Sequence, residues 1–131
     1  MAQTILFVDD DSGLQFVDDD SGLQRVMTKF LVLEGFTPVV AANGQEALDY
    51  LRGGGDAKVI VLDLRMPVMD GWAFRKEQRS DPGLAGIPVI VLSGADAERV
   101  PEIEAAAAFR KPVSFSDVIA VVRRLCGVSP H

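Results

Sequence analysis

The chain has 131 residues, of which 48% are hydrophobic, and this length favours a single domain, residues 1–131, with a substantial buried core. Its 13 basic and 19 acidic residues give a net charge of −6, and no cluster of Lys and Arg offers a surface for nucleic acid. Apolar runs of at most five residues argue against a membrane span, and the first residues lack the pattern of a signal peptide. Because Cys126 is the only cysteine, we expect no internal disulfide and a cytoplasmic location.

Apolar runs of strand length alternate with amphipathic helical patterns, which predicts an α/β fold with a parallel sheet. The first strand is expected at Thr4–Val8, and a helix capped by Ser21 stops at Gly35. The pattern continues with a strand at about Thr37–Ala41, a helix capped by Asn43 that ends at 53–55, a strand at Val59–Asp63, a helix at about 72–79, and a strand from Pro88 to Ser93. A short helix at about 101–107, a strand at Ala107–Arg110 and a helix capped by Ser114 that ends at Gly127 complete it.

Four of the predicted strands end in groups suited to phosphoryl transfer. Asp9-Asp10-Asp11 follow the first strand, Asp63 ends the buried run Val-Ile-Val-Leu, Ser93 ends the next strand, and Lys111 follows the last. The carboxyl ends of parallel strands meet at one edge of an open α/β sheet, so we expect these groups to lie together. A carboxylate nucleophile, acids for a divalent cation, and fixed donors for the phosphoryl oxygens are what such a transfer needs.

At these residues the chain resembles the receiver domain of bacterial two-component response regulators. The resemblance rests on the run Asp63-Leu64-Arg65-Met66-Pro67-Val68-Met69-Asp70-Gly71, on Ser93-Gly94-Ala95 and on Lys111-Pro112. It implies a flavodoxin-like, doubly wound sheet of five parallel strands in the order 2-1-3-4-5, with helices on both faces. It also implies a signalling domain that receives a phosphoryl group from a sensor histidine kinase or a histidine phosphotransfer protein and then changes its affinity for a downstream protein.

The resemblance assigns a role to each matching residue. Asp63 would accept the phosphoryl group, while Ser93 and Lys111 would contact its oxygens, with the peptide between Lys111 and Pro112 in the cis form. Mg²⁺, or Mn²⁺, would be held by an acid pair, by Asp63 and by the backbone carbonyl of Arg65. Whether the chain also catalyses its own phosphorylation and dephosphorylation is left open.

Two features depart from the receiver pattern. Receivers usually carry Tyr or Phe three residues before the lysine, where this chain has Ala108, and strand alternation directs Phe109 to the opposite face. The interval between Ser93 and Lys111 is also short, so the helix between them is trimmed. These departures put the usual aromatic switch of the family in doubt.

The nine residues 7–15 recur without change as residues 16–24, at the junction of the first strand and the first helix. The sequence does not say whether this tandem duplication is natural. The acid pair is therefore either Asp9 and Asp10 or Asp18 and Asp19. Asp19 lies 44 residues before Asp63, close to the usual family interval, whereas Asp10 lies 53 before it.

The choice of copy depends on the strand that each one completes. The first copy belongs to an apolar strand, residues 5–8, while the second would bury Gln15 at a cost of about 1–3 kcal/mol if unpaired. Nine additional loop residues cost only about 1–2 kcal/mol. We therefore rank the first copy with an inserted loop ahead of the second copy. A homodimer that exchanges the strand through residues 4–20 ranks third.

Two other functions compete with the receiver. Phe7-Val8-Asp9-Asp10-Asp11 resembles the Asp-x-Asp strand end of haloacid-dehalogenase-type phosphatases, which use an aspartate nucleophile. That class needs the nucleophile on the first strand, a longer chain and a cap domain. A third reading is a non-phosphorylated interaction module whose metal site the repeat has disrupted.

Overall fold

The computed structural model describes residues 3–9, 23–63, 71–93, 105–110 and 114–127. Its centre is a sheet of five parallel strands in the order β2-β1-β3-β4-β5. The strands are β1 (Thr4–Val8), β2 (Thr37–Ala41), β3 (Val59–Asp63), β4 (Val89–Ser93) and β5 (Ala107–Arg110). The helices are α1 (Leu23–Leu33), α2 (Gly44–Arg52), α3 (Gly71–Ser80) and α4 (Phe115–Leu125).

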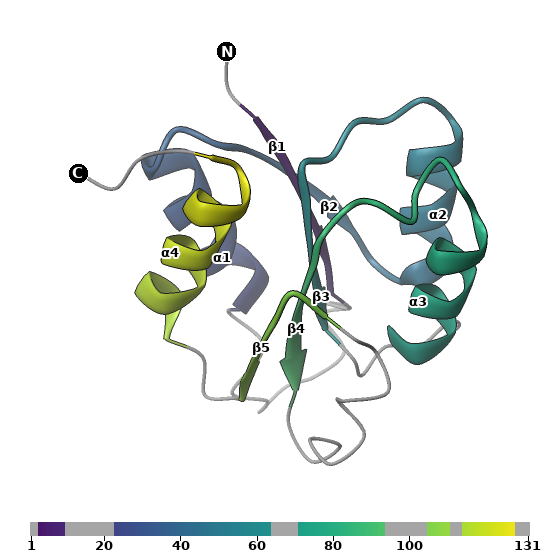
Figure 1. Ribbon diagram of the computed structural model, residues 1–131. Helices are drawn as coiled ribbons and strands as arrows, with labels where there is room; N and C mark the ends of the chain where they lie inside the picture. The colour runs from purple at the N-terminus through teal and green to yellow at the C-terminus, as the bar shows by residue number, and fades with distance from the viewer. Residues whose placement is uncertain (1–2, 10–22, 64–70, 94–104, 111–113, 128–131) are drawn as a thin grey trace.

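The helices cover both faces of the sheet. In Figure 1, α1 and α4 lie on one side and α2 and α3 on the other, with the strands between them. This is the flavodoxin-like, doubly wound arrangement, and the predicted strand order is confirmed. Among the described helices, none is long and apolar enough to span a bilayer.

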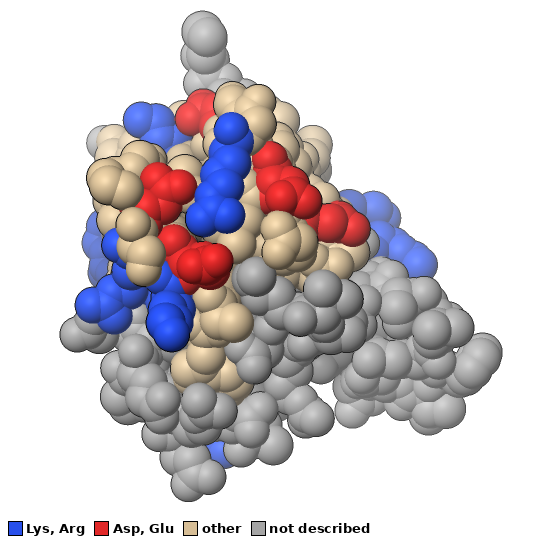
Figure 2. Space-filling view, turned by 90° about the vertical axis from the view of Figure 1, so that its right-hand side faces the viewer, with Lys and Arg blue, Asp and Glu red and all other residues tan. Residues whose placement is uncertain are grey.

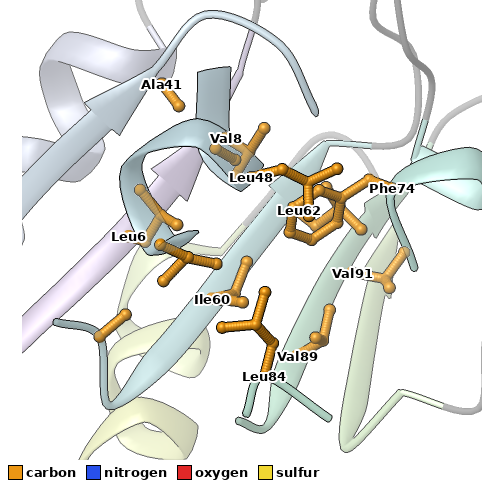
Figure 3. Close-up of a cluster of buried hydrophobic side chains, with 13 residues drawn as sticks. Leu6, Val8, Ala41, Leu48, Ile60, Leu62, Phe74, Leu84, Val89 and Val91 are labelled. Carbon is orange, nitrogen blue, oxygen red and sulfur yellow. The ribbon is translucent and has the colours of Figure 1, made fainter. Parts of the chain in front are cut away.

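Strand alternation divides the buried side chains into two core clusters. Every residue of β3 and β4 is buried, as expected for central parallel strands covered on both faces. One cluster lies beneath α2 and α3, where Leu48 and Phe74 meet the strands (Figure 3). The buried strand residues of this cluster are Leu6, Val8, Ala41, Ile60, Leu62, Val89 and Val91. The second cluster lies beneath α1 and α4 and takes its strand residues from Ile5, Phe7, Val59, Val61, Ile90 and Leu92.

Several predicted helix boundaries are confirmed by hydrogen bonds. The Asn43 side chain accepts from the backbone amide of Glu46 at 2.9 Å, which makes it the N-cap of α2. Gly35 ends the turn after α1 with φ of 90°, a conformation that favours glycine, and its amide donates to Val32 at 3.0 Å. Ser21, the expected cap of α1, lies outside the described residues.

Two expectations near the chain's end need correction. Ser114 stands at the N-cap of α4, but its hydroxyl makes no capping hydrogen bond, and only its carbonyl joins the first turn. The helix expected at 101–107 does not reach its predicted end, because Ala107 is the first residue of β5. The amide of Ala106 donates to the Val89 carbonyl at 2.9 Å, so the chain there already runs along β4. Residues 101–104 lie outside the described residues.

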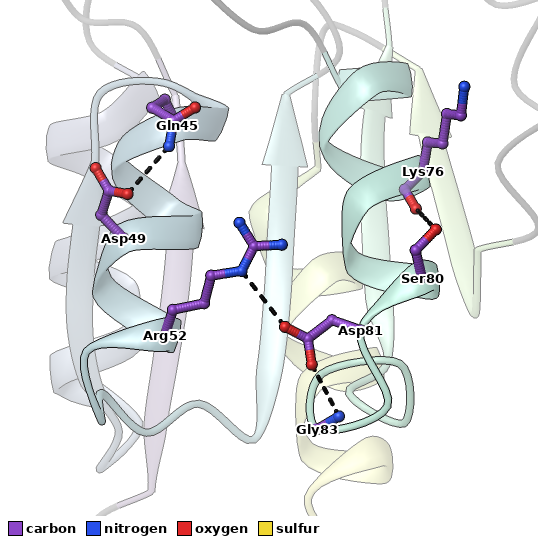
Figure 4. A network of polar contacts seen from close by, with 7 residues as sticks. All are labelled: Gln45, Asp49, Arg52, Lys76, Ser80, Asp81 and Gly83. Atoms are coloured by element: carbon purple, nitrogen blue, oxygen red, sulfur yellow. Dashed lines mark hydrogen bonds and ion pairs between the residues drawn. The ribbon is translucent and has the colours of Figure 1, made fainter.

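Polar contacts tie α2 to the turn after α3. Arg52 Nε lies 3.4 Å from Asp81 Oδ2, and Asp81 Oδ1 accepts from the amide of Gly83 at 3.0 Å (Figure 4). Gln45 reaches Asp49 within α2 at 3.0 Å. Acidic and basic side chains alternate over this helical face (Figure 2), so it is not the single-sign positive surface that nucleic acid binding requires.

Gln78 is a fully buried amide that the sequence did not single out. Its Nε2 donates to the carbonyls of Leu84 and Ile87 at 2.9 and 3.0 Å, and its Oε1 accepts from Arg75 at 2.8 Å. The only sequence signal is its spacing of four residues from the buried Phe74, which places both on one helical face. Gln78 therefore fixes the path of the chain from α3 into β4.

We expect Gln78→Leu to lower the free energy of unfolding by about 2–4 kcal/mol, because two carbonyls lose their donor inside the protein. Chemical denaturation followed by circular dichroism measures the loss. Gln45→Leu is the matched control, since its contact to Asp49 is exposed, and it should change stability by less than about 0.5 kcal/mol. Equal effects of the two substitutions would contradict the role of Gln78.

The two copies of the nine-residue repeat have separate uses in this fold. The first copy supplies the end of β1 and Asp9, as ranked first, and the second supplies Leu23 and Gln24 at the start of α1. Thirteen residues, 10–22, lie between these two points, where a chain with one copy would have four.

Deleting either copy yields the same 122-residue chain, which keeps every residue of β1, Asp9 and α1. We expect this deletion to raise the free energy of unfolding by about 1 kcal/mol, because the shorter connection costs less entropy to close. Denaturant titration with Trp72 fluorescence and circular dichroism tests it. A destabilised deletion chain would show that the additional nine residues make contacts the fold depends on.

Candidate phosphoacceptor site

Three of the predicted site residues come together at the carboxyl edge of the sheet, the lower edge in Figure 1. Asp9 directly follows Val8, whose β3 partner is Leu62, so Asp9 comes level with Asp63. Asp63 pairs with Leu92 of β4, and Ser93 is the next residue. The structure thus gathers two carboxylates and a hydroxyl on the neighbouring strands β1, β3 and β4.

All three side chains are buried at this edge. Asp9 and Asp63 are each 3% exposed and Ser93 is 2% exposed. Charged side chains buried to this degree are held by hydrogen bonds, counter-charges or a metal ion, and two of them at the carboxyl edge of a parallel sheet make this edge the candidate functional site. Strand alternation places Asp9 and Asp63 on the side of the sheet that faces α1 and α4, and Ser93 on the other side.

Asp9 is anchored through its backbone. Its amide donates to the carbonyl of Ala41 at 3.0 Å, which continues the pairing of β1 with β2 for one residue beyond the strand. This contact holds the carboxylate beside β3. The sequence could not reveal it, because a backbone carbonyl carries no residue-specific signal.

The donor set suits a hard divalent cation. Two carboxylates on adjacent strands supply oxygen ligands of the kind Mg²⁺ prefers, together with water and phosphate oxygens. Within the described ranges, no three His, Cys, Asp or Glu residues come close enough to form a complete metal cluster. Asp9 and Asp63 would therefore share such an ion with a backbone carbonyl, water or a further acid.

Five of the predicted site residues have no described position. They are Asp10, Asp18, Asp19, Arg65 and Lys111, and they all fall outside the described residues. For Lys111 the nearest described residue is Arg110, which ends β5 and pairs with Ser93. The last described residue of β5 thus lies beside Ser93, and Lys111 is the next residue in the sequence.

The expected departure at β5 is visible in the structure. Ala108 is exposed and pairs with Val91, while Phe109 is half-buried and packs with the cluster beneath α1 and α4. A methyl group therefore stands where receivers usually carry an aromatic ring. Phe109 cannot replace that ring, because it lies on the other face of the sheet.

Comparison with known proteins identifies the family of this chain. The model of the response regulator receiver domain family matches residues 14–123. The chain belongs to this family. Receiver domains interact with histidine kinases or phosphotransfer proteins, and they generally bind Mg²⁺ at their acidic site. The buried acids at the ends of β1 and β3 are therefore candidates for that acidic site.

Curated relatives agree with the family. The chain is 36% identical over 121 residues to a transcriptional regulatory protein CpxR homolog from Haemophilus influenzae, covering 91% of this chain and 47% of that protein. It is 35% identical over 104 residues to chemotaxis protein CheY1 from Helicobacter pylori, covering 77% of each chain. This chain spans about half the length of the first curated relatives it matches.

Solved structures show the same fold. The receiver domain of Francisella response regulator 1452 aligns with a TM-score of 0.76 and 27% identity, covering 94% of this chain and 95% of that one. The signal receiver domain of a signal transduction histidine kinase from Syntrophus aciditrophicus aligns with a TM-score of 0.82 and 28% identity, covering 99% and 95%.

The family match also bears on the repeat. It begins at residue 14, so it includes the whole second copy and leaves out residues 1–13, which contain β1. In the structure the first copy forms β1 and brings Asp9 to the site. Sequence spacing and three-dimensional packing thus select different copies.

Proposed function

We propose that this receiver accepts a phosphoryl group on Asp63 from a histidine kinase or a histidine phosphotransfer protein and signals by altered protein–protein binding. The observation that carries the proposal is the gathering of Asp9, Asp63 and Ser93, all buried, at the carboxyl edge of a receiver fold. Of these groups, Asp63 ends the central strand between the acid of β1 and the hydroxyl of β4.

The reaction is a direct transfer between two nucleophiles. A carboxylate oxygen of Asp63 attacks the phosphorus of a phosphohistidine, the phosphorus–nitrogen bond breaks, and its electron pair returns to the imidazole. The product is an acyl phosphate, whose hydrolysis makes the signal transient. Ser93 and Lys111 are assigned to donate hydrogen bonds to the phosphoryl oxygens.

Asp9, Asp10 and the carbonyl of Arg65 are assigned, with Asp63, to hold Mg²⁺. When bound, the ion neutralises charge that develops on the phosphoryl oxygens. The chain's own contribution is to present two carboxylates from neighbouring strands at a fixed separation, with Asp9 anchored to Ala41.

We further propose that residues 1–131 act as one stand-alone cytoplasmic receiver whose repeat arose by tandem duplication. The similarity to chemotaxis protein CheY1 over 77% of both chains supports the stand-alone type. The downstream partner is a protein. A homodimer that exchanges residues 4–20 is the alternative assembly, and size-exclusion chromatography with light scattering separates it from a monomer.

Titration with acetyl phosphate and beryllofluoride, with and without Mg²⁺, tests the proposed function. A receiver should gain one acid-labile phosphoryl group only when Mg²⁺ is present, and beryllofluoride should shift the amide spectrum of residues at the carboxyl edge. A phosphatase would instead release inorganic phosphate, and its phosphoryl intermediate would lie on an aspartate at the end of the first strand. A chain that takes up neither reagent is an interaction module and contradicts the proposal.

We expect Lys111→Ala to separate phosphorylation from the conformational response, because the lysine charge is assigned to connect the end of β5 with the phosphoryl group. Amide chemical shifts in the presence of beryllofluoride measure the response, which should fall by more than half. Lys58→Ala is the matched control, since Lys58 is exposed at the opposite edge of the sheet, before β3, and should leave the response unchanged. An unaltered response in Lys111→Ala would contradict the assigned role of Lys111.

A further inference from the structure

The position of β1 between β2 and β3 makes strict demands on the residues that fill it. Residues 5–8 are completely buried. Leu6 and Val8 pack beneath α2 and α3, whereas Ile5 and Phe7 pack beneath α1 and α4. A segment can replace this strand only if four consecutive side chains suit these two clusters.

The second copy of the repeat, extended by the two residues that precede it, meets three of these four demands. Aligned with residues 5–8, it offers Leu14, Gln15, Phe16 and Val17, so the last two side chains are identical. Leu14 in place of Ile5 conserves volume and apolar character. The one mismatch is Gln15, which would bring an amide into the position of Leu6.

Backbone pairing does not distinguish the copies. β1 exchanges parallel ladder hydrogen bonds with β2 and β3, and these bonds depend on the backbone alone. The connection to α1 favours the second copy, because only residues 19–22 would then separate Asp18 from Leu23, compared with residues 10–22 after Asp9. The second copy thus brings one unfavourable buried side chain, Gln15, whereas the first copy leaves nine additional residues between the strand and α1.

The family match is an independent observation. It begins at residue 14, so it includes the whole second copy and leaves out Thr4–Val8, the segment that forms β1 in the structure. The packing in the structure thus supports the first copy, and the extent of the family match supports the second.

We propose that the position between β2 and β3 accepts either copy, and that the chain exchanges between two registers that differ by nine residues. The first copy is the major occupant and the second, because of Gln15, the minor one. The exchange carries Asp18 to the place of Asp9, so the site beside Asp63 keeps its acid in both registers.

The test compares the thermal unfolding of four variant chains with that of the parent by circular dichroism. Phe7→Asp places a charge in a fully buried position of the major register and should force the second copy into the sheet. This variant should still unfold cooperatively, with a midpoint about 5–15 °C below the parent. Phe16→Asp should leave the midpoint within about 2 °C. The double variant should not fold, and neither should Phe7→Asp in the 122-residue chain, which has no second copy.

The outcomes separate the proposal from its alternatives. Loss of folding in Phe7→Asp alone would overturn it, since only the first copy could then serve as β1. If Phe16→Asp failed to fold while Phe7→Asp folded, the proposal would also be overturned, because only the second copy could then form the strand. A rescued Phe7→Asp chain that is a dimer by light scattering would show exchange between protomers instead of within one. None of these readouts requires phosphorylation, so they stand apart from the proposed function.

A second measurement uses Gln15→Leu, which removes the mismatch of the second copy. In the amide spectrum, residues that flank β1, such as Val39 and Ile60, should show a second set of signals of comparable intensity. A single set, identical to that of the parent, would overturn the two-register proposal.

Discussion

Replacing Asp63 by Asn is expected to abolish phosphoryl incorporation from acetyl phosphate in the presence of Mg²⁺. The substitution keeps the size of a side chain that is only 3% exposed but removes the nucleophilic carboxylate. Mass spectrometry of the intact chain measures the loss, which should be complete, and the fold should remain intact by circular dichroism. Asp56→Asn is the matched control, because Asp56 is exposed before β3 at the opposite edge of the sheet, and it should be phosphorylated like the parent.

The position of the label decides between the receiver and its enzyme-class rival. Peptide mapping should place the phosphoryl group on Asp63 alone. A label on Asp9, Asp10, Asp18 or Asp19 would favour a phosphatase-like reaction on the first strand. Undiminished incorporation in Asp63→Asn would exclude Asp63 as the acceptor.

Replacing both Asp9 and Asp10 by Asn is expected to weaken Mg²⁺-dependent beryllofluoride binding about tenfold or more, because the cation loses its ligands from β1. The matching substitution of Asp18 and Asp19 should change the affinity by less than about twofold, since the first copy completes the sheet. Fluorescence or calorimetric titration at fixed ionic strength measures both. Replacing all four aspartates should eliminate binding, including any that the second copy supplies.

The reverse ranking would show that the second copy holds the metal and that the first is an appendage. Two double variants that each lose binding but regain it when mixed would indicate a strand exchanged between protomers. Equal, partial losses in both variants would mean that the two copies share the site.

The central strands could be read directly from the sequence. Val59–Asp63 and Val89–Ser93 are four apolar residues followed by a polar one, a composition and length typical of a strand buried on both faces. Asn43 and Gly35 likewise marked helix ends, because a capping side chain and a positive φ each need a particular residue type. The gathering of Asp63 and Ser93 at one edge followed from the parallel sheet, since all its strands end on the same side.

The weaker signals were decided by contacts between distant parts of the chain. The helix predicted at 101–107 does not extend to Ala107, because that residue begins β5 and the amide of Ala106 donates to the carbonyl of Val89 on β4. Ser114 does not cap α4 through its side chain, although its residue type favours that role. The importance of Gln78 depends on two backbone carbonyls that lie six and nine residues further along the chain.

The sequence by itself determined the position of Asp63 at the end of a buried strand and the identity of the nine-residue repeat, because each depends on local composition and spacing, while the strand order was implied by the resemblance that its motifs carry. Which copy becomes β1 was decided only by the tertiary structure. The two copies share the same Phe-Val-Asp end, so they differ only in the residues before it. Leu6 packs between the sheet and the helices α2 and α3, and this packing favours the first copy over the second, which would place Gln15 there. Local spacing favours the second copy, but the free energy of filling a buried position exceeds the small entropy cost of a longer loop.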